Sequence, residues 1–258
     1  MSILALVGFR SDRSEEPKIF ANHLSGIELV DYSVHTVIAD QPRERLLVGS
    51  LYGISIVDPS GLSSVNFELP SGLEMKTMET VAIGNDEFLI LGTNIGIHYI
   101  RLVDGIPNMD SIISHEIGYV SNIAELTSDS DDSSVVFLGE QMAWKSNLFA
   151  DDPLNPQFSE PEELGGLSEM ISDGNATALS IGHASIEGRI PLLLIGTDVG
   201  LIAWNTTDGS LSMGEPWWVF NRFNAEEFVT PNIFNPAESG KVSSIAVESN
   251  PGGSDYVW

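Results

Sequence analysis

Residues 215–236 are the part of the sequence richest in side chains that could bind a ligand. The segment reads EPWWVFNRFNAEEFVTPNIFNP and combines six aromatic residues with an arginine and glutamates. Aromatic walls with a few convergent polar groups are typical of ligand clefts. The candidate ligand-binding residues, for a sugar, a peptide or an amphiphile, are Trp218, Arg222, Glu226 and Glu227. The alternative is that residues 217–220 form an outer strand, which the remainder covers as a small helix.

Motifs for metal binding and catalysis are weak or absent. In the run SDSDDSS (128–134), Asp129, Asp131 and Ser133 alternate as calcium ligands do, with Glu140 at the last ligand position. The sixth position is Ser134 instead of the required glycine, so a solvated turn is favoured. No nucleophile elbow, phosphate loop or zinc-protease motif occurs. We therefore assign no catalytic residue, no metal ligand and no cofactor.

The histidines also lack the spacing of metal ligands. His98 lies within an apolar run and His35 begins another, so we expect hydrogen-bonded structural roles for these two. The five histidines are His23, His35, His98, His115 and His183.

Composition restricts the class of partner. The 37 acidic residues against 11 lysines and arginines give a net charge of −26, which repels phosphate backbones, so nucleic acid is not an expected partner. Such an excess suits a protein kept soluble in high salt or one that meets cations outside the cell. The absence of cysteine excludes disulfides and thiolate catalysis. No apolar run reaches the ~20 residues of a membrane span, and the first residues lack the pattern of a signal peptide.

One stretch of sequence recurs along the chain. An apolar run, Gly-Ser/Thr, two residues, Gly and a second apolar run occur at 45–61, 88–105 and 192–209, with a shorter copy at 135–147. The first glycine is expected to let the chain turn, and the second to supply positive φ at a tight hairpin. We take these glycines as structural repeat anchors: Gly49, Gly53, Gly92, Gly96, Gly139, Gly196 and Gly200.

Strand-like runs surround each centre. Such runs precede the centres at 35–40, 79–84, 120–126 and 175–182, and others follow at 63–69, 110–116 and 216–220. Each unit thus predicts four short antiparallel strands, whose two apolar faces must be covered by neighbouring sheets. That arrangement is an all-β fold, the β-propeller. A β-sandwich or a β-solenoid would not require this repeated centre at this repeat length.

The repeat resembles those of the two-component-regulator propeller family, most closely in LLIGTDVGLIAWN (193–205). Ser50 and Glu140 depart from it where the family has threonine, and Val57 and Ile100 where it has an aromatic residue. The resemblance implies a sensory or ligand-binding propeller, typically exported and attached to a signalling module.

Counting units predicts a single propeller domain over residues 1–258. Complete repeats cover roughly 35–77, 78–119, 120–174 and 175–240, and partial blades cover 1–34 and 241–258. Pairing of C-terminal strands with N-terminal candidates at 3–9 and 26–33 would close about five blades and remove open sheet edges. The other interpretation is a fragment of a larger ring.

Three functional hypotheses follow. The first is a non-enzymatic propeller that binds a small ligand or a protein, as the sensory part of a larger extracytoplasmic protein. The second is a propeller hydrolase or lyase with carboxylates at the central axis. The third is a haloadapted surface module without a small ligand.

Overall fold

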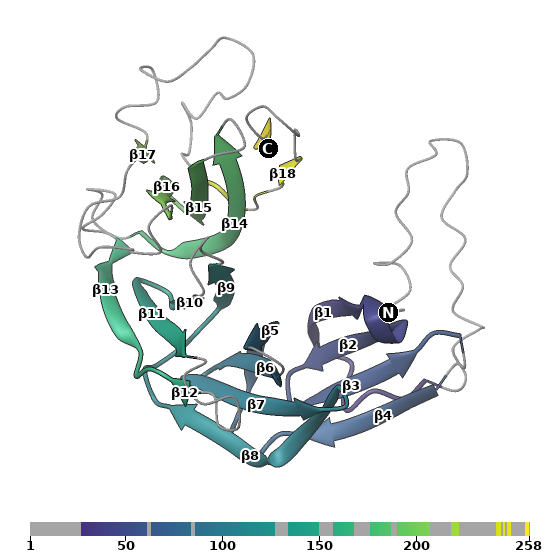
Figure 1. Cartoon of the computed structure of the whole chain (residues 1–258). Helices are drawn as coiled ribbons and strands as arrows, with labels where there is room; N and C mark the ends of the chain where they lie inside the picture. The colour runs from purple at the N-terminus through teal and green to yellow at the C-terminus, as the bar shows by residue number, and fades with distance from the viewer. Residues whose placement is uncertain are drawn as a thin grey trace, which may run out of the picture. The chain divides into compact units, whose positions relative to one another are not determined.

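The computed structural model describes residues 27–60, 63–83, 86–126, 134–149, 157–167, 176–186, 190–206, 218–221, 241–243, 245, 247–248 and 256–257. These residues belong to two compact units that meet in the sequence between Met75 and Lys76. Strands make up nearly all of the regular structure, as Figure 1 shows. In the described part, no helix has the length and hydropathy of a membrane span.

The first unit contains one antiparallel sheet in the order β1-β2-β3-β4. Each strand pairs with the next along the chain, and the 3-10 turn η2 (Gln41–Arg43) joins the first two. Buried Val48 and Val57 pack with Leu29 on one side of this sheet. The strands are β1 (Val34–Asp40), β2 (Arg45–Ser50), β3 (Gly53–Asp58) and β4 (Ser63–Glu68).

The strand expected over residues 26–33 is not formed in its described part, residues 27–33. The carboxylate of Asp31 accepts the backbone N–H of Ser33 at 2.7 Å and that of Tyr52 at 2.9 Å. A side chain that captures nearby backbone donors favours a turn over an extended ladder. This segment therefore bends before β1 instead of pairing as a strand.

The second unit begins with a sheet in the order β5-β6-β7-β8. Its second strand is buried from Phe88 to Thr93, as expected for a strand that is covered on both faces. The strands are β5 (Met75–Ile83), β6 (Asp86–Thr93), β7 (Ile97–Val103) and β8 (Ile106–His115).

The next sheet has a divided outer strand. It contains β9 (Asn122–Leu126), β10 (Ser134–Leu138) and β11 (Met142–Phe149), and then two short strands, β12 (Gln157–Phe158) and β13 (Glu162–Gly166), that both pair with β11. Between them, Ser159 stays attached because its carbonyl accepts the Ser146 hydroxyl at 2.7 Å. The sequence of this unit predicts no outer strand, because these two pieces are too short to show a strand pattern.

A third sheet in this unit has the order β14-β15-β16-β17. Its strands are β14 (Ala178–Ile186), β15 (Ile190–Thr197), β16 (Gly200–Asn205) and β17 (Trp218–Asn221). Beyond it, β18 (Val247–Glu248) and β19 (Tyr256–Val257) pair with each other as a separate two-stranded sheet.

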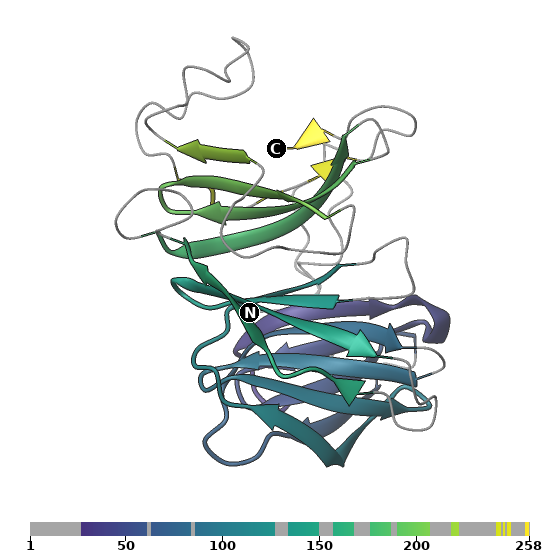
Figure 2. The ribbon, with the colours of Figure 1, turned by 60° about the vertical axis from the view of Figure 1, so that its left-hand side comes forward.

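Consecutive sheets of the second unit pack face to face. Figure 2 shows the sheet of β14–β17 (green) lying over that of β9–β13 (teal). Each buried cluster draws residues from two neighbouring sheets, which is how blades cover one another's apolar faces. Val81 and Ile90 of the β5–β8 sheet pack with Ile123 and Phe137 of the β9–β13 sheet. Val136 and Ala143 of the β9–β13 sheet pack with Leu193 and Ile202 of the β14–β17 sheet. Ala184 and Leu194 of the β14–β17 sheet pack with Ile245 and with Val247 of β18.

The hydroxyl of the repeat motif closes the central hairpin. Ser50, Thr93 and Thr197 each donate to the carbonyl of the glycine three residues later, at 3.1, 3.0 and 3.0 Å. In the second motif the same Gly96 carbonyl also accepts the backbone N–H of Thr93 at 2.9 Å, so the buried hydroxyl adds a second hydrogen bond to this turn carbonyl. The serine or threonine of the motif thus has a structural role.

The second glycine of the motif has the expected positive φ in two of the three complete motifs, and it also allows a close approach of the neighbouring strand. Gly96 and Gly200 have φ of 157° and 159°, whereas Gly53 of the first unit is not a positive-φ glycine. A Cβ on Gly96 would collide with the backbone carbonyl oxygen of His115 on the outer strand. Glycine is needed there because β8 passes directly over it.

The residue that follows Gly92, Gly139 or Gly196 accepts a backbone hydrogen bond from the chain that enters the next sheet. In the second unit, Thr93 accepts from Val120 at 2.9 Å, Glu140 from Ala178 at 2.9 Å, and Thr197 from Val242 at 2.8 Å. The anchors Gly92, Gly139 and Gly196 thus lie at corresponding places where consecutive sheets connect.

Candidate functional site

Two facing glutamates lie on the first strands of neighbouring sheets, Glu79 on β5 and Glu125 on β9. We call the contact between the β5–β8 and β9–β13 sheets the seam. Because side chains alternate along a strand, Glu79 shares a face with Val81, and Glu125 shares one with Ile123. Val81 and Ile123 pack together in the seam. The two carboxylates therefore lie on the sides of their sheets that face each other.

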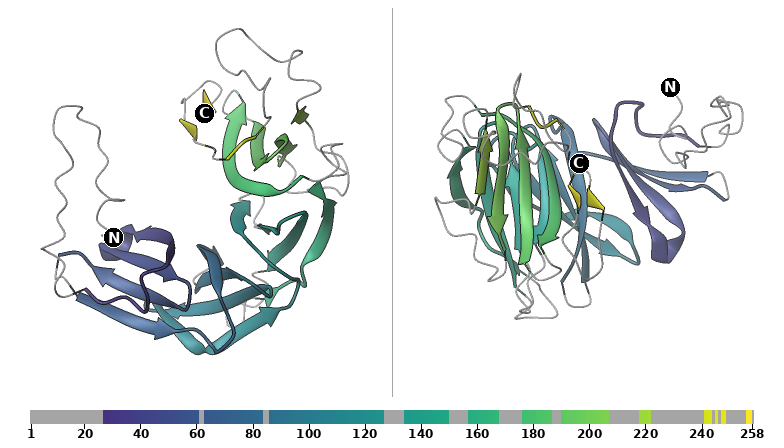
Figure 3. Two further views of the ribbon diagram at one scale, coloured as in Figure 1. Left: turned by 180° about the vertical axis from the view of Figure 1, so that it is seen from behind. Right: turned by 90° about the horizontal axis from the view of Figure 1, so that it is seen from above.

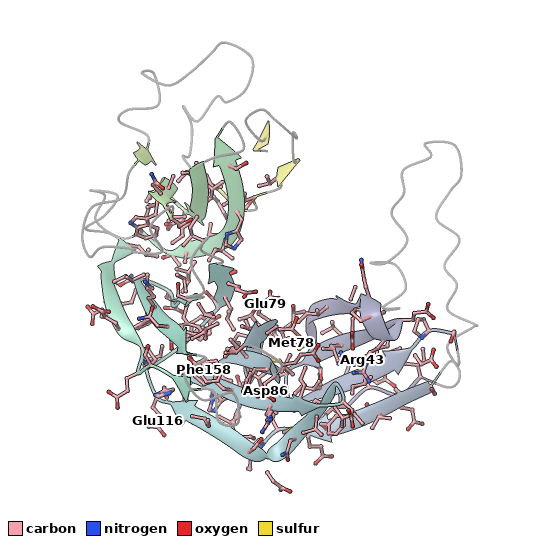
Figure 4. All side chains as sticks on the ribbon, viewed as in Figure 1. Arg43, Met78, Glu79, Asp86, Glu116 and Phe158 are labelled. Carbon is pink, nitrogen blue, oxygen red and sulfur yellow. The ribbon has the colours of Figure 1, made fainter. Side chains whose placement is uncertain are left out.

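Both glutamates belong to strands at one edge of their sheets, because β5 and β9 each stand at one end of the strand order. Figure 4 labels Glu79 on β5, the strand farthest from β8 in its sheet. Figure 1 labels β5, β9 and β14 on the same side of their three sheets, and Figure 3 shows these sheets from behind and from above. In a propeller the first strand of each blade is the innermost, so the pair belongs to the inner edge of the second unit.

Burial raises the pKa of both carboxyl groups. For Glu79 the main cause is desolvation, which the backbone N–H of Thr80 partly opposes by donating to Oε1 at 3.2 Å. For Glu125 desolvation is again the main cause, and the negative charge of Glu79 raises its pKa further. The pKa of Glu125 therefore depends on the charge of Glu79.

The pair lacks compensation from basic side chains. Among the described residues, neither Glu79 nor Glu125 takes part in an ion pair, and no positive charge lowers the pKa of either group. The described residues also contain no group of three or more His, Asp and Glu side chains arranged for a metal ion. Two partly desolvated carboxylates can accept an ammonium or guanidinium group, or they can share a proton.

A third titratable group lies on the first strand of the following sheet. His183 on β14 is exposed, and desolvation lowers its pKa, so its imidazole is neutral near pH 7. Strands β9 and β14 contact each other. The inner edge of the second unit thus presents two acids and a neutral imidazole on consecutive sheets.

The candidate residues of the aromatic segment are only partly placed. Trp218 begins β17, with its backbone opposite Ala203 of β16. This position agrees with the outer strand that we considered for residues 217–220. Arg222, Glu226 and Glu227 lie outside the described residues, as do Asp129, Asp131 and Ser133 of the acidic run.

His98 has the hydrogen-bonded structural role that we expected. Its side chain is 3% exposed, with Nε2 at 3.1 Å from Thr93 Oγ1 and Nδ1 at 2.8 Å from Ser114 Oγ. Since the Thr93 hydroxyl donates to Gly96, it accepts from Nε2–H, and Nδ1 then accepts from Ser114. Desolvation lowers the pKa of His98, with an opposing effect from Glu116. His35 instead has an exposed side chain on β1, and His23 lies outside the described residues.

Sequence reasoning missed Glu79 and Glu125, although a signal was present. Each is an acid that shares strand parity with buried residues, as in ETVAI (79–83) and NIAEL (122–126). An acid on the apolar face of a strand is uncommon without a partner or a function. This pattern could have identified both residues as candidate site residues. It could not have shown that the two residues face each other.

Comparison with known proteins identifies the fold and no family. No family model matches the sequence, and neither does any curated protein. The extracellular domain of a candidate one-component system from B. thetaiotaomicron superimposes with a TM-score of 0.50 and 14% identity, over 84% of this chain and 25% of that one. At this identity the likeness shows the fold alone. Together with the stacked four-stranded sheets, it makes the chain a β-propeller.

Two further structures are more distant. BBS1N in complex with ARL6DN gives a TM-score of 0.44 at 16% identity, over 68% of this chain and 48% of that one. A GH43 β-1,3-galactosidase gives 0.43 at 10% identity, over 72% and 45%. Both scores are too low for any conclusion. This chain spans between a quarter and about half of the length of the three structures.

Proposed function

We propose that this chain is a non-enzymatic binding propeller whose Glu79–Glu125 pair accepts a positively charged group of a small ligand or of a partner protein. The observation that carries the proposal is the pair itself. Two acids lie on facing sides of the seam at the inner edge, and burial raises the pKa of each. A cation placed between them would relieve both their repulsion and their desolvation.

The chemistry favours an organic cation over a bare metal ion. A guanidinium is weakly hydrated and offers several N–H donors to carboxylate oxygens, so it loses less on leaving water. A divalent metal would require more oxygen ligands than two carboxylates supply. The net charge of −26 adds long-range attraction for any cationic ligand.

The test is calorimetric titration with N-acetylarginine amide, a monovalent cation whose only charge is its guanidinium. The double variant Glu79→Gln/Glu125→Gln should lower the affinity by about tenfold or more, which corresponds to about 1.4 kcal/mol. The control Glu140→Gln/Glu160→Gln removes the same charge from two exposed positions and should change the affinity less than about twofold. Equal losses in the two variants would assign the binding to net charge and overturn the proposal.

The raised pKa of the pair also supports the second candidate function, general acid–base catalysis in a hydrolase or lyase. An acid that keeps its proton near neutral pH beside an ionised one is a common arrangement of catalytic carboxylates. Turnover separates the two candidates. A hydrolase would cleave members of a chromogenic glycoside panel and lose this activity in Glu79→Gln, whereas a binding propeller would cleave none.

We also propose that Trp218, Arg222, Glu226 and Glu227 belong to a ligand-binding segment, as the composition of residues 215–236 favours. Replacing Trp218 and Arg222 together by alanine should weaken ligand binding and leave the melting temperature unchanged. A variant with a lower melting temperature and normal ligand binding would show that the segment has only a structural role.

The five-blade closure within a single domain remains a proposal. The pairing of β18 with β19 supports a fifth blade that begins at the C-terminal end, and the family resemblance supports a sensory role in a larger extracytoplasmic protein. Deleting residues 241–258 should cause unfolding or aggregation if they complete a closed ring. An unchanged melting profile would contradict the closure.

A further inference from the structure

The seam contains a second polar feature, which lies within a cluster of aromatic rings. Tyr99 of β7 stacks on Phe158 of β12 with ring centroids 3.7 Å apart. Edge-to-face contacts join Tyr99 to His115 at 5.8 Å and to Phe137 at 6.4 Å. Figure 4 labels Phe158, which β12 contributes from the outer part of its sheet. The tyrosine ring is thus enclosed by residues of both sheets.

Two polar atoms of this cluster are buried without a partner. Among the described residues, Tyr99 Oη and His115 Nε2 are the buried side-chain atoms for which no hydrogen bond is formed. The side chain of Tyr99 is only 1% exposed. Buried hydroxyl and imidazole groups rarely remain unsatisfied, because desolvation without a hydrogen bond is costly. Both atoms occur on residues whose rings contact each other, which suggests one shared partner.

Ser146 supplies a third polar group. Its side chain is fully buried, and its hydroxyl donates to the carbonyl of Ser159 at 2.7 Å. Ser159 Oγ lies 3.4 Å from Ser146 Oγ, which leaves at least one lone pair of Ser146 Oγ available. The Ser146 hydroxyl is close enough to oppose the rise in the pKa of Tyr99, although the two form no hydrogen bond of normal geometry. Burial raises that pKa to about 12, so the phenol remains a neutral O–H donor.

We infer that the aromatic cluster encloses a binding site for one buried water molecule, held by Tyr99 Oη, His115 Nε2 and Ser146 Oγ. The water accepts a hydrogen bond from the phenol O–H and donates hydrogen bonds to the imidazole nitrogen and to the serine oxygen. Three hydrogen bonds are the usual number for a buried water in a protein. An anion does not suit the site, because the neighbouring aromatic rings would not compensate its charge.

Counting long-lived waters by oxygen-17 magnetic relaxation dispersion tests the inference on the full chain. Tyr99→Phe keeps the ring and its stacking but removes the donor, so the count should fall by one and the melting temperature should also fall. Tyr119→Phe is the matched control, because its ring is 37% exposed, and it should change neither quantity.

A site without a bound water predicts a different result. If the phenol is simply unsatisfied, Tyr99→Phe removes a cost, so the melting temperature stays equal or rises while the water count is unchanged. An unchanged count would overturn the inference whatever the melting temperature does. A second variant, Ser146→Ala, should also lower the count by one, which protects the test against a repacking effect specific to Tyr99.

Discussion

At the scale of single residues, the Glu79–Glu125 pair makes stability depend on pH. Both folded-state pKa values are raised above the ordinary value of 4.5. The contribution of the protonated pair is therefore fully present below that value and is lost as pH rises through the folded pKa values. Ionisation then forces two desolvated charges to face each other across the seam.

This sign gives a prediction for Glu79→Gln/Glu125→Gln, which mimics the protonated pair. Between about pH 4.5 and pH 7.5, the melting temperature of the variant should rise progressively relative to that of the parent chain. Thermal unfolding followed by circular dichroism checks this. A difference that stays constant with pH would mean that the two acids are not perturbed. The exposed-site control Glu140→Gln/Glu160→Gln should give a much flatter difference.

The hydroxyls of Thr93 and Thr197 are expected to contribute differently to the free energy of unfolding, because they have different hydrogen-bond partners. Thr197→Val removes the hydroxyl that donates to the Gly200 carbonyl and accepts from the Val199 N–H, and it should cost about 0.5–1.5 kcal/mol of unfolding free energy. Thr93→Val removes the corresponding hydroxyl and also leaves Nε2–H of buried His98 without its acceptor, so it should cost about 1–3 kcal/mol. Urea unfolding measures both. Equal costs would contradict the hydrogen-bonded role of His98.

At the scale of elements, the close approach of β8 to Gly96 predicts a local effect. Gly96→Ala should push the outer strand away and destabilise the chain by about 1–3 kcal/mol. Hydrogen exchange should show faster exchange at the paired residues Ile97 and His115. Gly118→Ala is the control, because its Cβ would meet nothing within 4 Å although its φ of 94° is strained. Loss of β7–β8 protection in the control as well would contradict the crowding argument.

The sequence predicts those strands whose positions are determined by a local pattern of apolar and turn residues. The hairpins around Gly49, Gly92 and Gly196 have apolar runs and turn residues at fixed spacing, so their strands were found within a few residues. The divided outer strand of β12 and β13 depends on the attachment of Ser159 to Ser146, which no local pattern reveals. The pair of Glu79 and Glu125 likewise depends on the packing of two sheets, which is tertiary information.

At the scale of the whole molecule, the charge of −26 opposes folding through self-repulsion. Raising sodium chloride from about 0.05 M to about 1 M shortens the Debye length from over 10 Å to about 3 Å and should screen this repulsion. We expect the melting temperature to rise by several degrees over that range in differential scanning calorimetry. A flat or falling melting temperature would show that local ion pairs outweigh the net charge.

The propeller fold followed from the repeat because a four-stranded sheet with two apolar faces needs neighbours on both sides. Ring closure did not follow, since it depends on strands at the two ends of the chain that no repeat constrains. The chemistry of a ligand could not be predicted from the sequence. The composition of residues 215–236 does not say where their side chains lie. The Glu79–Glu125 pair forms only because two sheets pack together.

The central claim is that the seam brings Glu79 and Glu125 together, and carbon-13 NMR of the glutamate side-chain carboxyls tests it directly. In a pH titration, the pKa of Glu125 should lie above its ordinary value of 4.5 and should move back toward it in Glu79→Gln, because the neighbouring negative charge is gone. A Glu125 that titrates at its ordinary value, or one whose pKa does not respond to Glu79→Gln, would contradict the account.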